Sequence, residues 1–369
     1  MEKDLFLGID TSNYKTSVAI VDGCGRIICD IRKLLKVKEG EKGLRQSYAL
    51  FQHIENLPGM ISEAFRAVPQ GSGTFKAVAF SDRPRPVEGS YMPVFRAGEL
   101  SAVSAASALG IPVFGFSHQE GHLEAIKAFS DFKECDEYLA YHLSGGTCEL
   151  LKVSGGKIEI LGGSKDISFG QLLDRLGVFL GLQFPAGEEL DRMACSAAEK
   201  LSRLKNDRGL EAGKESELLL KKIKIENLKF NLSGTETKLL RIAGTLKNNE
   251  KTQGKSNYEL NALIKETFDV IADCLIRLTS EAVRATGIPK VMFAGGVSQS
   301  RYISDRLKEH FDSDSFGKAG GSIAESTESK GISEEKSRIP QITFGRQELS
   351  TDNAVGTALL ALQKYTKGR

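Results

Sequence analysis

The sequence predicts an α/β protein made of two similar halves, and three observations support this prediction. Short apolar runs alternate with longer segments of helical periodicity, as in mixed sheets covered by helices. A strand followed by a polar turn and a hairpin occurs twice, near residue 10 and near residue 144. The 369 residues also suffice for two cores, because single cores stop growing at about 250–300 residues.

The first half has the element order of a ribonuclease-H-like domain. Apolar runs at residues 5–9, 17–21 and 26–34 predict three strands, the last two joined by a Gly-rich hairpin turn. The elements expected after them are a helix at 44–65, a strand at 75–80, a helix at 97–109, a strand at 112–116 and a helix after residue 117. Three strands, helix, strand, helix is typical of that domain.

The second half begins in the same way. Its expected elements are strands at 138–143, 149–153 and 158–161, a helix at 260–286, a strand at 291–294 and a last helix at 353–365. Residues 312–340 contain mostly Ser, Gly, Glu and Lys, and we expect a mobile loop there. The predicted domains are therefore residues 1–134 and 135–369.

Composition excludes some classes of protein. The 50 basic and 48 acidic residues nearly cancel, which argues against a nucleic-acid coat protein but leaves a local basic patch open. The six cysteines form no C-x-x-C pair and are interpreted as reduced thiols. Because no apolar run approaches the length of a membrane span, we expect a cytoplasmic protein without a membrane partner.

Three predicted strands end in turns rich in Gly, Ser and Thr, whose backbone N–H groups can hold phosphate oxygens. The turns are DTS at residues 10–12, SGGT at 144–147 and GGVS at 295–298. The first two occupy matching positions in the two halves and would hold one nucleotide from both sides of a cleft, while the third suits a nucleoside. A single Gly-Gly pair is more often only a turn. Three together favour the nucleotide-binding fold shared by actin, heat-shock chaperone ATPases and sugar kinases.

Two of the five histidines, His118 and His122, are four residues apart in a predicted helix. This spacing places both imidazoles on one face, where they can reach one metal ion. In the zinc-peptidase pattern H-E-x-x-H, the acid directly follows the first histidine and acts as general base. Glu120 is two positions on and points away from the pair, which argues against a peptidase. The alternative interpretation is two solvated polar residues.

Several short segments occur in a fixed order along nearly the whole chain. They are GIDTS at 8–12, HQEGH at 118–122, SGGT at 144–147, FGQLLDR at 169–175, LGL at 180–182, FPAG at 184–187, AGGV at 294–297 and TDNA at 351–354. In register, they resemble the motifs of the TsaD/Gcp family, the catalytic subunit of tRNA threonylcarbamoyladenosine synthesis. The family patterns are G-I-E-T-S, H-x-E-G-H, S-G-G-H-T, A-G-E-A-F-D-K, L-G-L, Y-P-G-G, A-G-G-V and T-D-N-x.

The resemblance implies a divalent metal bound by His118, His122 and Asp352. Iron is the usual assignment in the family, and zinc is the alternative. Two imidazoles and a carboxylate suit either ion and leave open positions for a substrate. From the residues alone, Asp352 is as well explained as an N-cap of the last helix.

The resemblance also implies an adenylate site, in which Asp174 and Asp191 accept ribose hydroxyls. Without it, Asp174 is simply a solvated helix residue. The expected nucleotide-binding residues are Ser144, Gly145, Gly146, Asp174, Gly187, Asp191, Gly295, Gly296 and Ser300. Asp10 and Ser144, one in each half, are the candidate catalytic residues.

The chain departs from the family pattern around these motifs. Gln171 replaces an acid, Glu236 replaces a lysine, Ser300 replaces an asparagine, and a histidine is lost after Gly146. A glycine loop is replaced by the Pro-rich residues 82–90, which contain Arg83 and Arg85. We expect one of these arginines to contact the substrate, since arginine clamps phosphate or carboxylate. The alternative is a rigid surface loop with solvated arginines.

The leading expectation is an acyltransferase. It would move the threonylcarbamoyl group from threonylcarbamoyl-adenylate to the adenosine next to the anticodon of tRNA, with accessory subunits as further partners. A paralogue that transfers a carbamoyl-type group to another acceptor is the first alternative. The second is a non-catalytic subunit that binds nucleotide, against which the intact ligand set argues.

Overall fold

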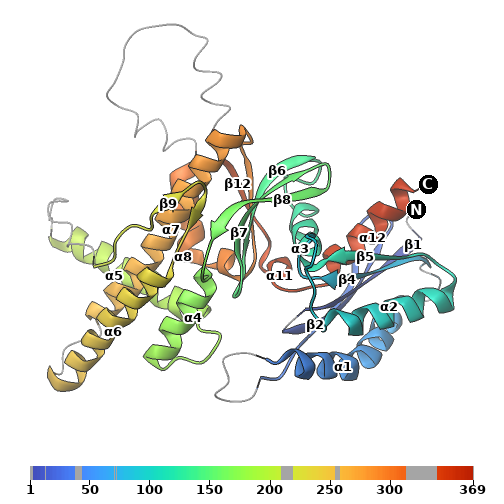
Figure 1. Cartoon of the computed structure of the whole chain (residues 1–369), viewed down its shortest axis with the longest axis horizontal. Helices are drawn as coiled ribbons and strands as arrows, with labels where there is room; N and C mark the ends of the chain where they lie inside the picture. Colours follow the sequence, from blue (N-terminus) through green and yellow to red (C-terminus); the bar gives the residue numbers. More distant parts are fainter. Residues whose placement is uncertain are drawn as a thin grey trace, which may run out of the picture. The chain divides into compact units, whose positions relative to one another are not determined.

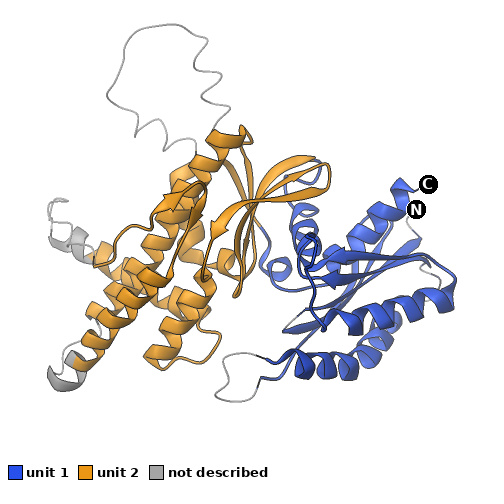
Figure 2. Cartoon of the chain, in the orientation of Figure 1, with its two compact units in different colours: residues 1–134, 345–369 blue, residues 135–344 orange. Residues whose placement is uncertain are grey.

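The computed structural model describes residues 3–12, 14–37, 44–69, 71, 73–208, 219–253, 258–312 and 339–368. The chain forms two compact units, one of residues 1–134 with 345–369 and one of residues 135–344 (Figure 2). Most of the predicted mobile loop at 312–340 lies outside the described residues. Among the described helices, none is both long and apolar enough to cross a membrane.

Unit 1 is a five-stranded sheet with helices on both faces (Figure 1). Its elements are β1 (Asp4–Thr11), β2 (Lys15–Asp22), β3 (Ile27–Leu34), α1 (Gln46–Ala67), β4 (Thr74–Arg83), α2 (Phe95–Leu109), β5 (Val113–Ser117), α3 (His118–Lys127), α11 (Gln347–Ser350) and α12 (Val355–Lys367). The strand order is β3-β2-β1-β4-β5. The β1–β2 and β2–β3 pairs are antiparallel, whereas the β1–β4 and β4–β5 pairs are parallel.

The two faces of this sheet are packed by different helices. Side chains alternate along β1, so Leu7 and Ile9 join the core formed with α1 and α2. Phe6 lies on the opposite face and packs with α12. Gly8 permits this packing, because a Cβ atom there would lie 2.4 Å from the carbonyl oxygen of Ala354.

The C-terminal segment differs from the predicted domain boundary, because residues 345–369 belong to unit 1 and not to a second domain of residues 135–369. The apolar face of α12, with Val355, Ala358 and Leu359, is buried in the same core as Phe6 and Ala79. Helical periodicity predicts that such a helix exists, but it does not say which sheet will cover its apolar face. The assignment to unit 1 is therefore a tertiary outcome.

Unit 2 repeats the topology of unit 1. Its elements are β6 (Glu137–Leu143), β7 (Cys148–Ser154), β8 (Lys157–Ser164), α4 (Phe169–Leu180), α5 (Gly187–Arg208), β9 (Ile225–Glu226), β10 (Lys229–Phe230), α6 (Ser233–Gln253), α7 (Tyr258–Thr286), β11 (Lys290–Ala294), the 3₁₀ helix η1 (Gly296–Gln299), α8 (Arg301–Phe311) and β12 (Gln341–Phe344). The strand order is β12-β11-β6-β7-β8-β10-β9. Its first five strands, from β12 to β8, correspond to the unit 1 strands in the order β5-β4-β1-β2-β3. The strand directions also correspond, so the predicted duplication of a ribonuclease-H-like unit is confirmed.

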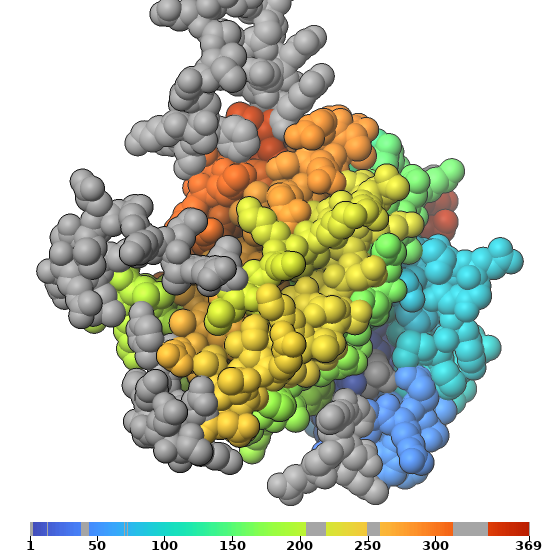
Figure 3. All heavy atoms as spheres, turned by 60° about the vertical axis from the view of Figure 1, so that its left-hand side comes forward, coloured from blue at the N-terminus to red at the C-terminus, as the bar shows by residue number. Residues whose placement is uncertain are grey.

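The two units differ after their third strands. Among the described residues, one helix, α1, lies between β3 and β4 in unit 1, whereas four helices and a short hairpin lie between β8 and β11 in unit 2. Atoms of α6 are visible in yellow on the face of the molecule shown in Figure 3.

The cysteines, all in described segments, are free thiols, as expected.

Candidate metal centre and nucleotide-binding turns

Helix α3 begins directly at the end of β5, and a capping box fixes its first turn. The Ser117 hydroxyl accepts a hydrogen bond from the Glu120 backbone N–H at 3.2 Å, and the Glu120 carboxylate accepts one from the Ser117 N–H at 2.6 Å. Glu120 therefore belongs to the cap, which agrees with the expectation that it points away from the histidine pair. His118 is the first residue of this helix and His122 follows one turn later.

Three potential ligand atoms converge at this point in unit 1. The Nε2 atoms of His118 and His122 are 3.0 Å apart, and Oδ1 of Asp352 lies 3.1 Å from His122 Nε2 and 3.5 Å from His118 Nε2. Ligand atoms about 2.1 Å from an ion, at angles of about 90–110°, are roughly 3.0–3.4 Å apart. The donor set and its spacing thus fit one divalent ion, and this is the single such cluster among the described residues.

Asp352 does not cap the last helix. The backbone N–H at the start of α12 is instead bound by Asn353, whose Oδ1 accepts from Val355 N at 3.0 Å. Asp352 uses its other oxygen, Oδ2, to accept a hydrogen bond from the Ser12 hydroxyl at 3.0 Å. Burial raises the pKa of the Asp352 carboxyl, but hydrogen bonds from His118 and His122 outweigh it and hold the pKa well below its usual range.

Asp10 lies behind the first histidine. Its side chain is 1% exposed, and its Oδ1 is 2.8 Å from Nδ1 of His118. Burial lowers the pKa of His118, but the carboxylates of Asp10 and Asp352 raise it to about 10. A carboxylate on Nδ1 fixes the ring so that Nε2 faces the ligand cluster, as is common for metal-binding histidines.

Small residues allow α3, which bears both histidines, and α12, which follows Asp352, to approach closely. A Cβ atom on Gly356 of α12 would lie 1.8 Å from the carbonyl oxygen of Gly121 in α3. Gly121 is adjacent to His122, and Gly356 is four residues after Asp352. The close approach therefore brings a ligand from residue 352 to a pair of ligands from residues 118 and 122.

In unit 2, the SGGT turn after β6 is held by its own serine. The Ser144 hydroxyl accepts hydrogen bonds from Thr147 N at 3.0 Å and from Gly146 N at 3.3 Å. Gly145 and Gly146 are exposed, and a Cβ atom on either would meet nothing within 4 Å. The turn packs on the start of α4, where the Ser168 hydroxyl donates to the Gly145 carbonyl at 2.6 Å.

The third predicted turn lies beside the second. Strands β6 and β11 are parallel neighbours, with His142 paired to Ala294, so their carboxyl ends meet at one edge of the sheet. Gly295 has φ 97°, and a Cβ there would lie 2.4 Å from the Leu143 carbonyl oxygen. The structure thus brings together the turns that contain Ser144, Gly145, Gly146, Gly295 and Gly296.

The expected ribose-binding carboxylates already bind protein groups. Oδ1 of Asp174 accepts from Ala186 N at 2.8 Å, beside Gly187, and burial raises the pKa of Asp174. Asp191 accepts from the Ser300 hydroxyl, from Arg301 N at 3.0 Å and from Tyr302 N at 3.2 Å. Asp191 therefore joins α5 to the start of α8, and it also lines a cavity of about 560 Å³ with Arg192, Cys195 and Arg301 among its other walls.

The substituted residues have partners that the sequence did not reveal. Gln171 completes a capping box with Ser168, a task that an amide performs as well as an acid. Glu236 forms two hydrogen bonds with Arg175, at 2.9 and 3.0 Å, so the reversed charge meets the neighbouring arginine. Arg83 donates to Asp82 at 2.6 Å and lies 3.9 Å from Glu120, so its charge is already partly neutralised within the chain.

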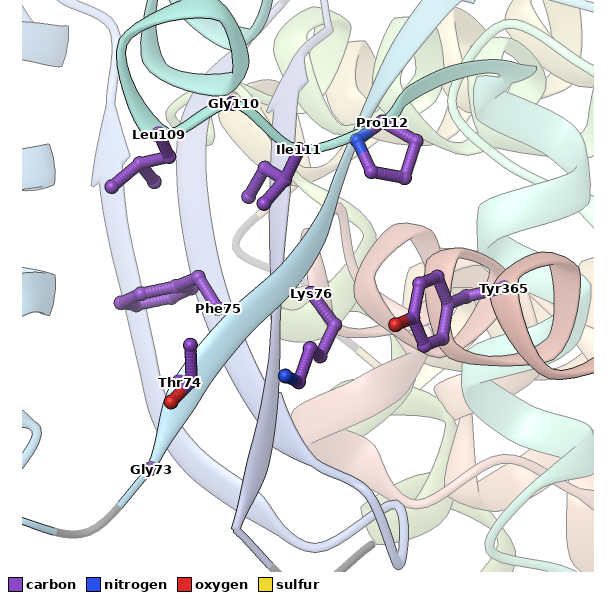
Figure 4. A pocket seen from close by; sticks show the side chains of 9 residues that line it. All are labelled: Gly73, Thr74, Phe75, Lys76, Leu109, Gly110, Ile111, Pro112 and Tyr365. Carbon is purple, nitrogen blue, oxygen red and sulfur yellow. The ribbon is translucent and has the colours of Figure 1, made fainter. Parts of the chain in front are cut away.

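A further cavity of about 520 Å³ lies in unit 1 at the amino ends of β4 and β5 (Figure 4). Its walls include Phe75, Lys76, Pro112 and Tyr365. The histidines lie at the carboxyl end of β5, so this cavity is at the opposite edge of the sheet from the ligand cluster. None of the predicted metal-binding, nucleotide-binding or catalytic residues lines this cavity.

The topology of the two units identifies the fold class of the protein. Two ribonuclease-H-like units of this topology make an α/β protein of the actin, heat-shock chaperone and sugar kinase type. The solved structure of HypF from T. kodakarensis has a similar fold, with a TM-score of 0.56 and 12% identity, and the match covers 100% of this chain and 48% of that one.

A model of the family TsaD, tRNA N6-adenosine threonylcarbamoyltransferase, matches residues 35–355. The chain belongs to this family of acyltransferases. It is 28% identical over 310 residues to the tRNA N6-adenosine threonylcarbamoyltransferase of Neorickettsia sennetsu, covering 84% of this chain and 85% of the relative. The enzyme of the same name from Geotalea uraniireducens is 29% identical over 297 residues, covering 80% and 79%.

Proposed function

We propose that the protein transfers a threonylcarbamoyl group from threonylcarbamoyl-adenylate to the adenosine next to the anticodon of tRNA, with a divalent metal at the cluster of His118, His122 and Asp352. The observation that carries this proposal is the convergence of the three ligand atoms within 3.5 Å of one another. Fe(II) and Zn both suit a set of two imidazoles and one carboxylate.

Residues around the cluster would prepare it for binding. Asp10 keeps the Nδ1 atom of His118 occupied, which leaves Nε2 for the ligand site. The Ser12 hydroxyl binds one oxygen of Asp352, which leaves the other oxygen facing the histidines. A bound divalent ion would supply a Lewis acid for the threonylcarbamoyl carbonyl.

The turns of unit 2 would bind the leaving group. The exposed glycines Gly145 and Gly146 leave room for the phosphate of AMP beside the backbone of this turn, and the adjacent Gly295 turn suits the nucleoside. The exocyclic amine of adenosine would attack the carbonyl carbon, the bond to the phosphate oxygen would break, and AMP would leave. No covalent enzyme intermediate is needed.

The proposal also includes partner subunits and a cellular compartment. A relative in Methanothermobacter thermautotrophicus is named a probable bifunctional tRNA threonylcarbamoyladenosine biosynthesis protein, and the match covers 83% of this chain and 50% of that protein. We therefore include accessory subunits among the partners of this chain. Six free cysteines suit a reducing compartment such as the cytoplasm.

A second candidate function is transfer of a carbamoyl-type group to another acceptor. The observation in its favour is the Arg175–Glu236 pair, because Glu236 stands where the family pattern has a lysine. The replacement removes the charge of the lysine, and the ion pair neutralises the charge of Arg175. A polyanionic acceptor such as tRNA is attracted by positive charge. A smaller or less charged acceptor would not need those cations.

The deciding experiment supplies the metal-loaded protein with threonylcarbamoyl-adenylate and bulk tRNA, with and without the presumed partner subunits. Mass spectrometry of the nucleosides should show threonylcarbamoyladenosine with the parent and with His310→Ala, which changes an exposed histidine in unit 2. The double variant His118→Ala, His122→Ala should give none. If the parent modifies no tRNA with the subunits present, the first candidate is rejected in favour of the second.

A further inference from the structure

The loop that joins β4 to α2, residues 84–94, is hydrogen-bonded at both ends to elements of the candidate metal centre. At its start, the Pro84 carbonyl accepts a hydrogen bond at 3.1 Å from the backbone N–H of Gln119, the residue after the first histidine of the cluster. At its end, the Val94 carbonyl accepts one at 3.0 Å from the hydroxyl of Thr11, the last residue of β1. Both ends of the loop are thus fixed to elements that carry or support the metal ligands.

The residue that follows this loop contacts one of the ligands. Phe95, the first residue of α2, is buried, and its ring centroid lies 6.2 Å from that of His118. Aromatic rings whose centroids are about 4.5–7 Å apart interact favourably. Tyr91 lies four residues before Phe95, and four residues span at most about 14 Å. A large substrate bound at the ligand cluster is therefore within reach of Tyr91.

Tyr91 exposes an aromatic ring to solvent beside a fixed cation. The residue is 60% exposed, and the guanidinium carbon of Arg96 lies 5.9 Å from the centre of its ring, within the range of a cation–π contact. Arg96 is held in turn by a hydrogen-bonded ion pair with Glu99, about one turn further along α2. A single exposed aromatic residue is common on protein surfaces. An exposed ring with a guanidinium group held next to it, in contrast, is an arrangement on which unpaired nucleobases stack.

We propose that Tyr91 and Arg96 form a stacking platform for an unpaired nucleobase of the acceptor RNA. The base lies on the exposed ring of Tyr91, and the charge of Arg96 strengthens the contact. Bases in single-stranded RNA loops are free to stack on aromatic side chains in this way. The inference rests on the proposed function and deepens it, because it assigns recognition of the acceptor to the loop that replaces the glycine loop of the family.

The test measures how tightly the metal-loaded, full-length protein, with its presumed partner subunits, binds an RNA stem-loop that copies a tRNA anticodon arm. Tyr91→Ala should weaken binding by about 5–150-fold, the usual effect of losing one base–aromatic stack. Tyr91→Phe should keep most of the affinity, since stacking needs the ring and not the hydroxyl. The metal content of both variants should equal that of the parent, because Tyr91 is not a ligand.

A fluorescence measurement tests the stack directly and carries the test if Tyr91→Ala does not fold. The chain contains no tryptophan, so Tyr91→Trp adds one fluorophore to it. The emission that this variant adds over the parent should fall when the RNA is bound, because a base stacks on the indole ring.

Tyr48→Ala and Tyr48→Trp are the matched controls, since Tyr48 is also exposed but lies in α1. They should bind the RNA as the parent does, without a change in the added emission. Parent-like affinity in Tyr91→Ala, or unchanged emission in Tyr91→Trp, would overturn the inference while leaving the proposed function intact. An equal loss of affinity in Tyr48→Ala would also overturn it. If the parent binds no RNA, the proposed acceptor and the inference fall together.

Discussion

Oδ1 of Asp10 lies 2.8 Å from Nδ1 of His118, although the two residues are separated by 108 positions in the chain. The pair explains why a carboxylate at the end of β1 is buried. Its charge is matched by the imidazole, and the imidazole is turned so that its other nitrogen faces His122 and Asp352. The turn at residues 10–12 therefore supports the ligand cluster through both Asp10 and Ser12.

The first prediction concerns the ligands themselves. Purified protein should contain about one divalent ion per chain, since the cluster is a single site, and the double variant His118→Ala, His122→Ala should lose it. Elemental analysis measures this directly, with His310→Ala as control. Equal metal content in the double variant and the parent would refute the site.

The second prediction concerns Asp10. Asp10→Ala should lower metal affinity by about 10–100-fold, because His118 loses the group that orients its ring. Asp10→Asn keeps a hydrogen-bond acceptor without the charge and should lose less. Competition with a chelator of known affinity measures the effect, and Asp131→Ala, at an exposed position of unit 1, serves as control. Unchanged affinity in Asp10→Ala would show that the contact is dispensable.

The third prediction tests how close packing builds the site. Gly356→Ala should destabilise the protein by about 1–3 kcal/mol, because the new methyl group collides with the Gly121 backbone and must push α3 and α12 apart. Metal affinity should fall as well, since α3 holds the two histidines and Asp352 lies just before α12. Urea unfolding and chelator competition give the two quantities. Gly59→Ala in α1, where a Cβ atom meets nothing within 4 Å, is the control.

The fourth prediction concerns the charge-reversed pair. Glu236→Lys restores the family pattern and releases Arg175, so AMP should bind several-fold more tightly if its phosphate lies near these residues. Glu236→Gln should fall between the parent and Glu236→Lys. Isothermal titration with AMP provides the measurement. The loss of one exposed ion pair should cost at most about 1 kcal/mol of stability, so folding should be preserved. An affinity that does not change would place the phosphate elsewhere.

Much of the fold was predictable because its signals are local. The apolar runs of β1, β2 and β6 and the periodicity of α7 predicted these elements close to their observed bounds. The short strands β9 and β10 and the helices α4 to α6 were not predicted individually. Two-residue strands have too few positions to show an alternating pattern, and their pairing is set by neighbours such as β8.

The candidate metal site was also predictable only in part. The four-residue spacing of His118 and His122 fixes their common face, because helix geometry relates residues one turn apart. The motif at 351–354 singled out Asp352 through resemblance alone, and its contact with the histidines requires α12 to pack on the sheet of unit 1. The nucleotide roles of Asp174, Gly187, Asp191 and Ser300 stay predictions.

By itself, the sequence determined many of the elements, the duplicated topology, the family and the histidine pair, since each depends on residues near one another or on ordered motifs. Only the tertiary structure decided that the last helix belongs to unit 1, that Asp10 supports His118, and that Ser12 binds Asp352. These outcomes depend on contacts between distant segments, and on whether backbones can approach as closely as Gly8, Gly121 and Gly356 allow. Such contacts are selected by packing of the whole unit, which no local pattern specifies.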